Sequence, residues 1–433
     1  MIGAIRRAFS TPDLRNKLLF TLGIIVLFRL GSFIPSPGID YTQVQQCVAS
    51  PQLNEGGFAM INLFSGGALL QLSIFALGIM PYITASIIVQ LLRVVIPRFE
   101  ALHKEGASGQ AKLTQYTRYL TIGLAILNAT TLVATVRSGA LFGQIEGCTN
   151  LITNDTWWGI TVLVITLTAG TGLIMWLGEQ ITEHGVGNGM SILIFTSVAA
   201  AFPSSLGAIL REQGIDVFLI VIAVGLVLVA LVVFVEQSQR RIPVQYAKRM
   251  VGRRMFGGTS TYIPIKVNMA GVIPVIFASS VLYLPSLIAQ FFNPETNWVE
   301  WINTYFTTGD HPIYIAAYAV LVIFFSYFYV AITFNPEEVA DNMKKYGGFI
   351  PGIRAGRPTA EYLSYVLSRI NFPGSLYLAF VALIPLIALV LINANQNFPF
   401  GGTSLLIVVG VGLETVKQID AQMQQRHYEG LLR

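Results

Sequence analysis

The sequence is poor in the residues on which soluble enzymes and disulfide scaffolds depend. Charged residues make up only 11% of its 433 residues, whereas soluble domains carry roughly a quarter. Its two cysteines exclude a disulfide framework or a cysteine-based metal site, and its four histidines fall in four different loops or tails. HExxH, P-loop and GxSxG motifs and paired intramembrane carboxylates are lacking too. We therefore expect no enzymatic activity, no cofactor and no metal.

Apolar residues are what the sequence has in abundance. They make up 54% of the chain, and the mean hydropathy is +0.64. Apolar runs near the ~20 residues that a membrane-spanning helix needs recur along the chain, which predicts an all-α polytopic membrane protein. The first run is long enough to span and is followed by Pro35-Ser36-Pro37, a poor cleavage site. We expect this run to stay as a span and not to be removed as a signal peptide.

Ten spans are predicted, five on each side of a loop near Pro203. Their expected limits are Lys17 to Pro35, Ser73 to Val95, Tyr119 to Arg137, Trp158 to Leu177, Gly185 to Phe202, Val217 to Val235, Val267 to Phe292, Ile313 to Phe334, Gly374 to Ile392 and Gly401 to Ile419. With five spans in each half, the second half must enter the membrane in the opposite orientation, as in an inverted repeat. The predicted halves are residues 1–205 and 206–433, although they share no convincing sequence similarity.

Lysine and arginine are distributed very unevenly between the two sides of these spans. Of the 27, four lie at or before the start of the first span and five lie near or after the end of the second. Seven follow the sixth span, five follow the eighth, and three lie near or after the end of the tenth, so 24 lie on one side. Only Arg137 and Arg211 are expected on the other side, and Arg29 lies within the first span. Positive charge collects in cytosolic loops. Both termini are therefore predicted to be cytosolic.

One apolar stretch, Ile61–Val95, is far longer than a single span. Residues that weaken or kink a helix interrupt it, namely Gly66, Gly67, Gly78 and Pro81. We expect a short re-entrant helix over about Ile61–Gln71 and a full span from about Ser73 to Val95. Broken backbone is tolerated at membrane depth only where it is buried in protein or lines a watery cavity. This stretch is therefore a candidate plug and pore wall, with its re-entrant part on the outer side.

Charged groups are nearly absent from the span centres. Glu179 and Glu414 are expected toward cytosolic ends, and only Arg29 is a candidate for an ion path. Because Arg29 lies near the outer end of its span, a snorkelling or structurally paired arginine is the simpler interpretation. A secondary transporter is one alternative function, but it would need an ion site. A polytopic membrane enzyme is another, but it would need convergent catalytic residues.

Two long cytosolic loops are the second unusual feature. The first, RRIPVQYAKRMVGRRMFGG (Arg240–Gly258), is basic with interleaved aromatic residues. The second, NPEEVADNMKKYGGFIPGIRAGRPTAEYL (Asn335–Leu363), contains Gly-Gly and Pro-Gly pairs that favour a shaped tip presenting Arg354 and Arg357. A basic loop beside a membrane is ordinarily a topology determinant or a contact for anionic lipid. A shaped basic surface also suits an acidic protein or an RNA backbone, and the physics of the sequence alone does not choose between these two.

Six strings, in order over nearly the whole chain, carry a more specific signal. They are FRLGSFIPSPGID (28–40), FSGGALLQLSIFALGIMPYITASIIVQLL (64–92), MWLGEQITEHGVGNG (175–189), KVNMAGVIPVIFASS (266–280), PGIR (351–354) and FGGTSLLIVV (400–409). Together they resemble the SecY/Sec61-alpha family, whose bacterial members are the central channel subunits of the Sec protein translocase. The resemblance implies a passive channel in the bacterial plasma membrane, with ten helices in two halves. It would move unfolded secretory polypeptides across the membrane and release transmembrane segments sideways into lipid.

The resemblance also implies positions for the moving parts. The plug falls on Ile61, Asn62, Phe64, Ser65, Gly66, Gly67 and Leu69. The pore ring falls on Ile79, Ile83, Ile194, Ile276 and Ile407. The lateral gate and its polar cluster fall on Thr84, Gln90, Asn188, Asn268 and Leu284, although each amide by itself is also suited to an ordinary helix–helix hydrogen bond. An apolar ring of this kind dewets and blocks ions.

The partners implied by the resemblance are the SecA ATPase, the ribosome, and SecE-like and SecG-like small membrane subunits. Signal sequences, nascent polypeptides and membrane lipids are also implied, and DNA is not. The docking loops, about 236–266 and 335–373, carry Arg240, Arg241, Lys248, Arg249, Arg253, Arg254, Arg354 and Arg357. Arg357 departs from the less basic stretch of many relatives. Cys47 and Cys148 are not part of the pattern, and they are either free thiols or a bridge between two outer loops.

Overall fold

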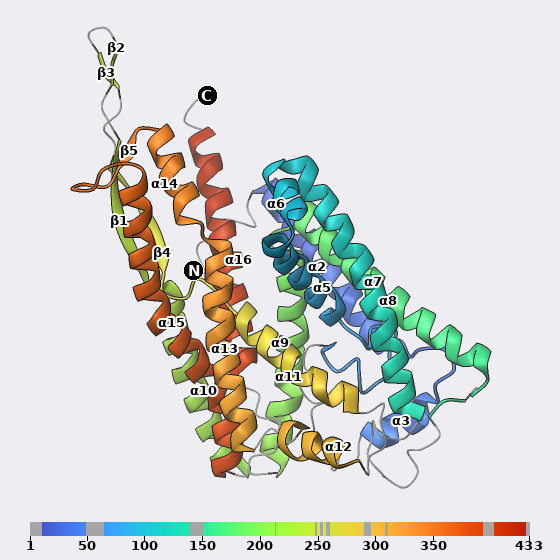
Figure 1. The fold of residues 1–433 in the computed structure, drawn as a ribbon. Helices are drawn as coiled ribbons and strands as arrows, with labels where there is room; N and C mark the ends of the chain where they lie inside the picture. The colour runs from blue at the N-terminus through green and yellow to red at the C-terminus, as the bar shows by residue number, and fades with distance from the viewer. Residues whose placement is uncertain are drawn as a thin grey trace.

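Long apolar helices make up most of the computed structural model (Figure 1). The structure describes residues 11–48, 65–137, 151–153, 155–212, 214–246, 249–251, 254–256, 260–289, 296–307, 311–392 and 402–429. Within them, six helical segments are long and apolar enough to cross a membrane. These are α2 (Pro12–Phe33), α7 (Ala107–Arg137), α8 (Trp157–His184), α10 (Gly214–Gln237), α13 (Pro312–Thr333) with the following α14 (Pro336–Lys345), and the first part of α15 (Arg357–Ile392). The prediction of an all-α polytopic membrane protein is confirmed.

The other four predicted spans fall on helices that are shorter, bent or less apolar. They are α5 (Met80–Val95), α9 (Gly189–Glu212), α11 (Ile273–Ala289) and α16 (Gly402–Glu429). α5 continues into α6 (Pro97–Lys104) through a bend of 97°. Each predicted span thus coincides with one helix, but α15 begins at Arg357, well before the expected start at Gly374. The shorter helices α3 (Tyr41–Val48) and α12 (Asn297–Ile302) lie at the opposite end of the molecule from α14 (Figure 1).

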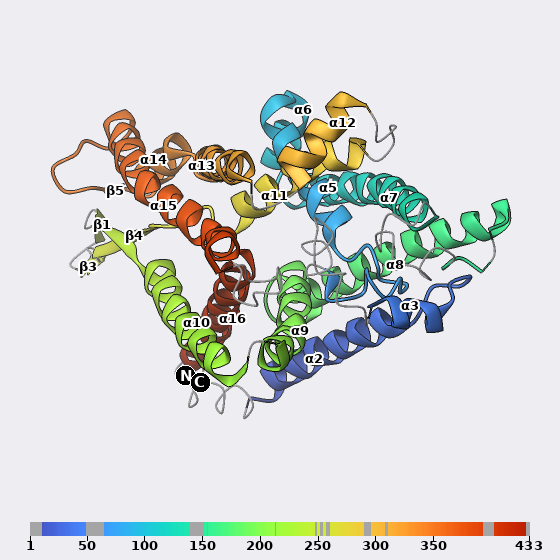
Figure 2. The ribbon, with the colours of Figure 1, turned by 90° about the horizontal axis from the view of Figure 1, so that it is seen from below.

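The helices gather into two groups that follow the order of the chain (Figures 1 and 2). α2, α5, α7 and α8 lie in one group, and α10, α13, α15 and α16 lie in the other. α9 packs against α8 on one side and against α10 and α16 on the other. A separate hydrophobic core lies within each group, and a third contains buried residues from both. This shared core is where the groups meet.

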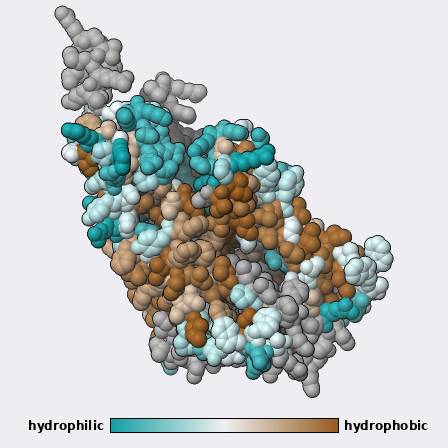
Figure 3. Space-filling model, viewed as in Figure 1, coloured by the Kyte–Doolittle hydropathy of each residue, from teal (hydrophilic) through white to brown (hydrophobic). Residues whose placement is uncertain are grey.

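A small β-sheet at one end of the molecule was not predicted. β1 (Gln239–Tyr246) pairs antiparallel with β4 (Ser260–Lys266) and with β5 (Gly348–Phe349), in the order β4-β1-β5. Beyond them, β2 (Arg249–Val251) and β3 (Arg254–Phe256) form a hairpin that projects from this end (Figure 1). Alternate residues of β1 and β4 are buried, which anchors the sheet on α10 and α14 side chains of the same core. Hydrophilic residues gather over this end, and hydrophobic ones form a broad band below it (Figure 3).

The stretch before α5 departs from the prediction. Residues 61–64 lie outside the described residues, and residues 66–79 form successive turns instead of a re-entrant helix and the first part of a span. Four residues have positive φ angles: Gly66 (66°), Gly67 (89°), Leu72 (47°) and Gly78 (57°). A right-handed helix cannot continue through such residues. The expected helix to Gln71 and the expected start of the second span at Ser73 are therefore wrong, and α5 begins at Met80.

Backbone hydrogen bonds hold this turn segment, residues 65–79, against the end of α2. Ser36 N donates to Leu72 O at 3.1 Å, and Ile74 N donates to Ile34 O at 3.0 Å. Pro35 and Ser73 therefore form an isolated antiparallel bridge. Most of the segment is buried, including Ala68 and Ala76 with no exposed surface. These hydrogen bonds satisfy part of the segment's polar backbone within the protein, as irregular chain at membrane depth requires.

Candidate functional site

Four of the five isoleucines predicted for the pore ring share one hydrophobic cluster. Ile79 from the turn segment, Ile194 from α9 and Ile407 from α16 are buried in it, and Ile83 from α5 packs against it. Ile276 on α11 is also buried, but outside this cluster, whereas Val272, one turn earlier, packs against it. We name these four residues of one cluster the isoleucine cluster. It lies where the N-terminal group meets α16.

The described part of the predicted plug touches the same core. Ile61, Asn62 and Phe64 lie outside the described residues. Ser65 and Leu69 are buried, and Leu69 N donates to Ser65 Oγ at 3.1 Å. Ala68, between them, belongs to the cluster that contains Ile79, Ile194 and Ile407. The turn segment and the isoleucine cluster therefore form one packed unit.

Arg29, the one charged residue within the first predicted span, is tied to this turn segment. Its Nη1 donates to Gly66 O at 3.0 Å, and its guanidinium lies over the Phe33 ring at 5.1 Å from the ring centroid. The sequence offered a snorkelling or a structurally paired arginine, and the structure shows the paired one. Gly66 itself was predicted for the plug, but its contact with Arg29 was not foreseen.

The residues predicted for the lateral gate do not form one polar cluster. Thr84 Oγ1 donates to Met80 O within α5 at 3.0 Å, and Asn188 Oδ1 accepts from Met190 N at 3.1 Å at the start of α9. Asn268 is buried, and its Nδ2 donates to Glu236 Oε1 at 2.6 Å. Among the described side chains, no hydrogen bond joins Asn188, Asn268 and Gln90, which is half-buried on α5. For Leu284 the structure describes only the backbone, on α11.

One ion pair and one hydrogen bond to a carboxyl group were not foreseen by the sequence-based prediction of the site. Arg118 on α7 makes a two-pronged ion pair with Glu179 on α8. Glu236, near the end of α10, holds Asn268 just before α11 begins, so it links two helices through the base of the β-sheet. The sequence offers little indication of either contact, because the partners are 61 positions apart in the first and 32 positions apart in the second.

The predicted docking arginines lie around the β-sheet. Arg240 and Arg241 are exposed on β1, and the Arg241 guanidinium lies over the Tyr262 ring at 4.8 Å from the centroid. Arg354 is exposed in the loop after β5, and Arg357, the first residue of α15, donates to Glu361 Oε1 at 3.0 Å. Lys248 and Arg253 lie outside the described residues. Only the backbone is described for Arg249 and Arg254, on β2 and β3. The pairing of β1 with β5 brings the two predicted loops into one surface.

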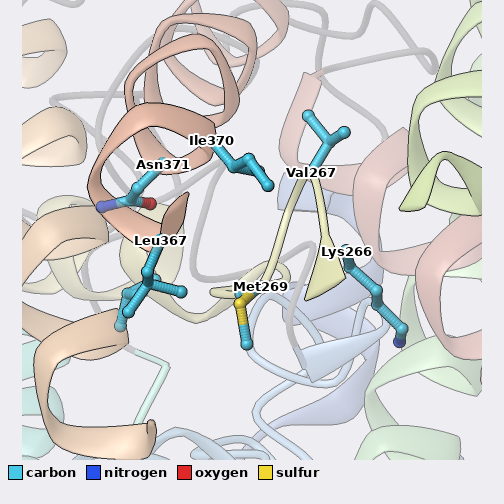
Figure 4. A pocket seen from close by; sticks show the side chains of 7 residues that line it. Lys266, Val267, Met269, Leu367, Ile370 and Asn371 are labelled. Carbon is cyan, nitrogen blue, oxygen red and sulfur yellow. The ribbon is translucent and has the colours of Figure 1, made fainter. Parts of the chain in front are cut away.

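A shallow hollow lies between the chain that leads from β4 to α11 and helices α13 and α15 (Figure 4). It is lined by Lys266, Val267, Met269, Val330, Leu367, Ile370 and Asn371. The hollow is too small for a polypeptide or a drug-sized ligand. Within the part of the chain that the structure describes, no group of histidine, cysteine and carboxylate side chains is arranged to hold a metal ion.

A family model described as SecY matches residues 73–416 of the chain. The chain belongs to the SecY family. The protein translocase subunits SecY of Streptomyces scabiei and Streptomyces coelicolor are each 66% identical to it, and that of Mycobacterium tuberculosis is 56% identical, with all of both chains covered in each case. These relatives confirm the resemblance that the six strings indicate.

Solved structures share the fold at much lower identity. One described as a protein conducting channel has a TM-score of 0.61 at 17% identity, covering 94% of this chain and 92% of its own. Sec61 from the canine ribosome–channel complex has a TM-score of 0.59, with the same identity and coverage. The arrangement of helices in Figures 1 and 2 is thus the arrangement of SecY and Sec61 channels.

Proposed function

We propose that the isoleucine cluster and the turn segment seal this SecY-family channel at rest. We also propose that polypeptides pass between these two parts when the channel opens. The chain is a protein translocation channel by family, and the proposal concerns how it closes and opens. The observation that carries it is the shared core of Ile79, Ile194 and Ile407, which come from three separate elements and both helix groups. An apolar constriction excludes water and ions, while flexible aliphatic side chains can close around a passing chain.

The lateral exit is proposed to lie between α5 and α11, which lie near each other in both views (Figures 1 and 2). α5 belongs to the first helix group and α11 to the second, so a separation of the groups opens a path to lipid. A sufficiently apolar segment leaves by this path, because it is more stable among acyl chains than in a wet pore. On this account Thr84 and Leu284 lie beside the path. Ile79 and Ile83 lie one turn apart next to it, so opening the path also disturbs the seal.

The β-sheet surface is proposed to receive the partner that drives transport. The pore itself is passive, and exposed Arg240, Arg241 and Arg354 supply positive charge for an acidic protein surface or an RNA backbone. SecA and the ribosome are the proposed partners, with SecE-like and SecG-like subunits in the membrane. A solved structure with this fold, the yeast Ssh1 complex, is bound to a ribosome. The proposed location is the bacterial plasma membrane with both termini cytosolic, which places this surface in the cytosol.

Ion leak through reconstituted channels tests the proposed seal. Replacing Ile83 and Ile276 with glycine removes one side chain of the isoleucine cluster and one buried side chain of α11, both predicted for the pore ring. The double change is expected to raise ion flux through vesicles that contain the channel. Ile126→Gly on α7 is the matched control, because the Ile126 side chain is exposed and lies outside the isoleucine cluster. A flux equal to that of the unaltered channel in the double variant would contradict the ring.

A second experiment tests the docking surface: Arg354→Glu is expected to slow motor-driven secretion while the amount of folded channel stays normal.

A further inference from the structure

Arg29 makes an unusual contact for a charged residue in a membrane-spanning helix. It lies in the outer part of α2, where a charge is costly unless its donors find partners. Among the residues that the structure describes, its partners are the Gly66 carbonyl and the face of Phe33. A carbonyl is neutral, so this contact does not cancel the charge as a carboxylate would. The arrangement therefore suits a role for Arg29 that depends on holding Gly66.

The Gly66 backbone has a positive φ angle and lies too close to α9 and Arg29 to leave room for a side chain. Its φ of 66° is one that side-chain-bearing residues rarely adopt. A Cβ on Gly66 would lie 3.1 Å from Ser197 Cα on α9 and 3.0 Å from Arg29 Nη1. Ser197 is fully buried one turn after Ile194. The Gly66 backbone is thus held between Arg29 of α2 and the very stretch of α9 that supplies Ile194 to the isoleucine cluster.

Apolar contacts hold the later part of the turn segment without help from Arg29. Phe28 on α2 stacks on Phe75, with ring centroids 5.9 Å apart, and Gly31 leaves room for the Phe75 ring. Ser73 is bridged to Pro35. The earlier part, Ser65–Gly67, carries two glycines and has few side chains to pack. The Arg29–Gly66 hydrogen bond is a directional contact of this part with α2.

We propose that Arg29 is a positioning residue that holds the Ser65–Gly67 turn against α9 and so keeps the channel closed. In a dry, closed channel the loss of this bond leaves a charge and a carbonyl unsatisfied, which is costly. Once a polypeptide and water enter, water can satisfy both groups and the bond is easily given up. The Arg29–Gly66 hydrogen bond is therefore strong while the seal is dry and weak once water enters. This difference favours two distinct states, a closed channel and an open one.

Ion flux through reconstituted channels tests this role, which rests on the proposed seal. Arg29→Gln removes the charge and shortens the side chain, and the flux is expected to rise roughly tenfold, in line with the loss of a hydrogen bond from a charged donor. Arg29→Lys keeps the charge and is expected to give an intermediate flux. Arg211→Gln, an exposed arginine at the end of α9, is the matched control. The quantity of folded channel is measured for each variant by gel filtration in detergent.

A crosslink distinguishes a released turn from a general loosening of the protein. Cysteines in place of Gly66 and Ser197 bring the Cβ atoms near the separation that a disulfide needs, since a Cβ on Gly66 lies 3.3 Å from Ser197 Cβ. Because a side chain at the positive φ of position 66 is strained, the same cysteine pair with Arg29 intact measures the leak that this strain causes by itself. In the Arg29→Gln background, oxidation of this pair is expected to restore the seal and reduction to reopen it. The Arg29→Gln channel without the added cysteines receives the same reagents as a control.

The outcomes separate this role from the proposed seal. An Arg29→Gln channel as tight as the Arg211→Gln control would overturn the role of Arg29, whether or not the glycine variants of Ile83 and Ile276 leak. A leak that the oxidised crosslink does not reduce would overturn it as well. A tight double-glycine variant beside a leaky Arg29→Gln channel that the crosslink reseals would contradict the isoleucine ring and support the role of Arg29.

Discussion

Arg118 on α7 grips Glu179 on α8 with two parallel hydrogen bonds, Nε to Oε1 at 2.9 Å and Nη2 to Oε2 at 2.8 Å. The Glu179 side chain is only 15% exposed and that of Arg118 39% exposed. The pair joins two helices of the group that carries the turn segment and α5. Bidentate arginine–carboxylate pairs of this kind fix geometry as well as adding energy.

Glu179→Gln is expected to lower the stability of the channel in detergent by about 1–3 kcal/mol, since it leaves the Arg118 guanidinium without its charged partner. The matched control is Glu361→Gln, which breaks the Arg357–Glu361 pair, where the side chains are 89% and 67% exposed. Exposed pairs contribute about 0–1 kcal/mol. The measurement is the midpoint of thermal unfolding for each variant. Equal shifts in the two variants would contradict a structural role for the Arg118–Glu179 pair.

Gly170 and Gly172 on α8 offer a second matched comparison. A Cβ on Gly170 would overlap the carbonyl of Ile74 in the turn segment, whereas a Cβ on Gly172 meets nothing within 4 Å. Gly170→Ala is therefore expected to destabilise the channel by about 1–3 kcal/mol, because the backbone of the turn segment must shift. Gly172→Ala is expected to be neutral or slightly stabilising. Thermal unfolding compares the two, and a neutral Gly170→Ala would show that the segment packs less closely on α8.

Cys47 is disulfide-bonded and is buried in the core of the N-terminal group. The sequence has one other cysteine, Cys148, which lies outside the described residues. Of the two possibilities left open by the sequence, the structure supports the bridge. Cys47→Ser is expected to change the mobility of the protein on a non-reducing gel and to lower its stability by about 2–4 kcal/mol.

The double variant checks that Cys47 and Cys148 act through one bond. Cys148→Ser is expected to lower the unfolding midpoint as much as Cys47→Ser does, and the double variant no further, because both changes remove the same crosslink. Additive losses, or an unchanged gel mobility in every variant, would mean that the two cysteines act separately.

The long apolar runs made the fold class predictable, because hydropathy over about twenty residues is enough to place a span. The turn segment was not predictable in the same way. Gly66, Gly67 and Gly78 signal breaks in a helix, but nothing local shows that Leu72 also takes a positive φ angle or that Ser73 pairs with Pro35. The resulting structure depends on the fit against α2 and α8.

Contacts between distant parts of the chain account for what else was missed. The pairing of Gln245 with Phe349 joins two loops about a hundred residues apart, so neither loop alone predicts the sheet. In the sequence, Arg118 and Glu179 each resemble ordinary charged residues near helix ends, and only the fold brings them together. The isoleucine positions were suggested by resemblance to the SecY family, since isoleucines on an apolar helix are otherwise expected to pack.

Site-specific photo-crosslinking of a polypeptide stalled during transport tests the central proposal most directly. A photoreactive side chain at position 194 or 407 is expected to crosslink to the stalled polypeptide, because both isoleucines lie in the isoleucine cluster. The same probe in place of Leu226 on α10, which is 65% exposed, is expected to give no crosslink to the stalled polypeptide. Crosslinking at positions 194 and 407 that requires a stalled polypeptide is the result predicted. Efficient transport without crosslinks at either position would contradict passage through the isoleucine cluster.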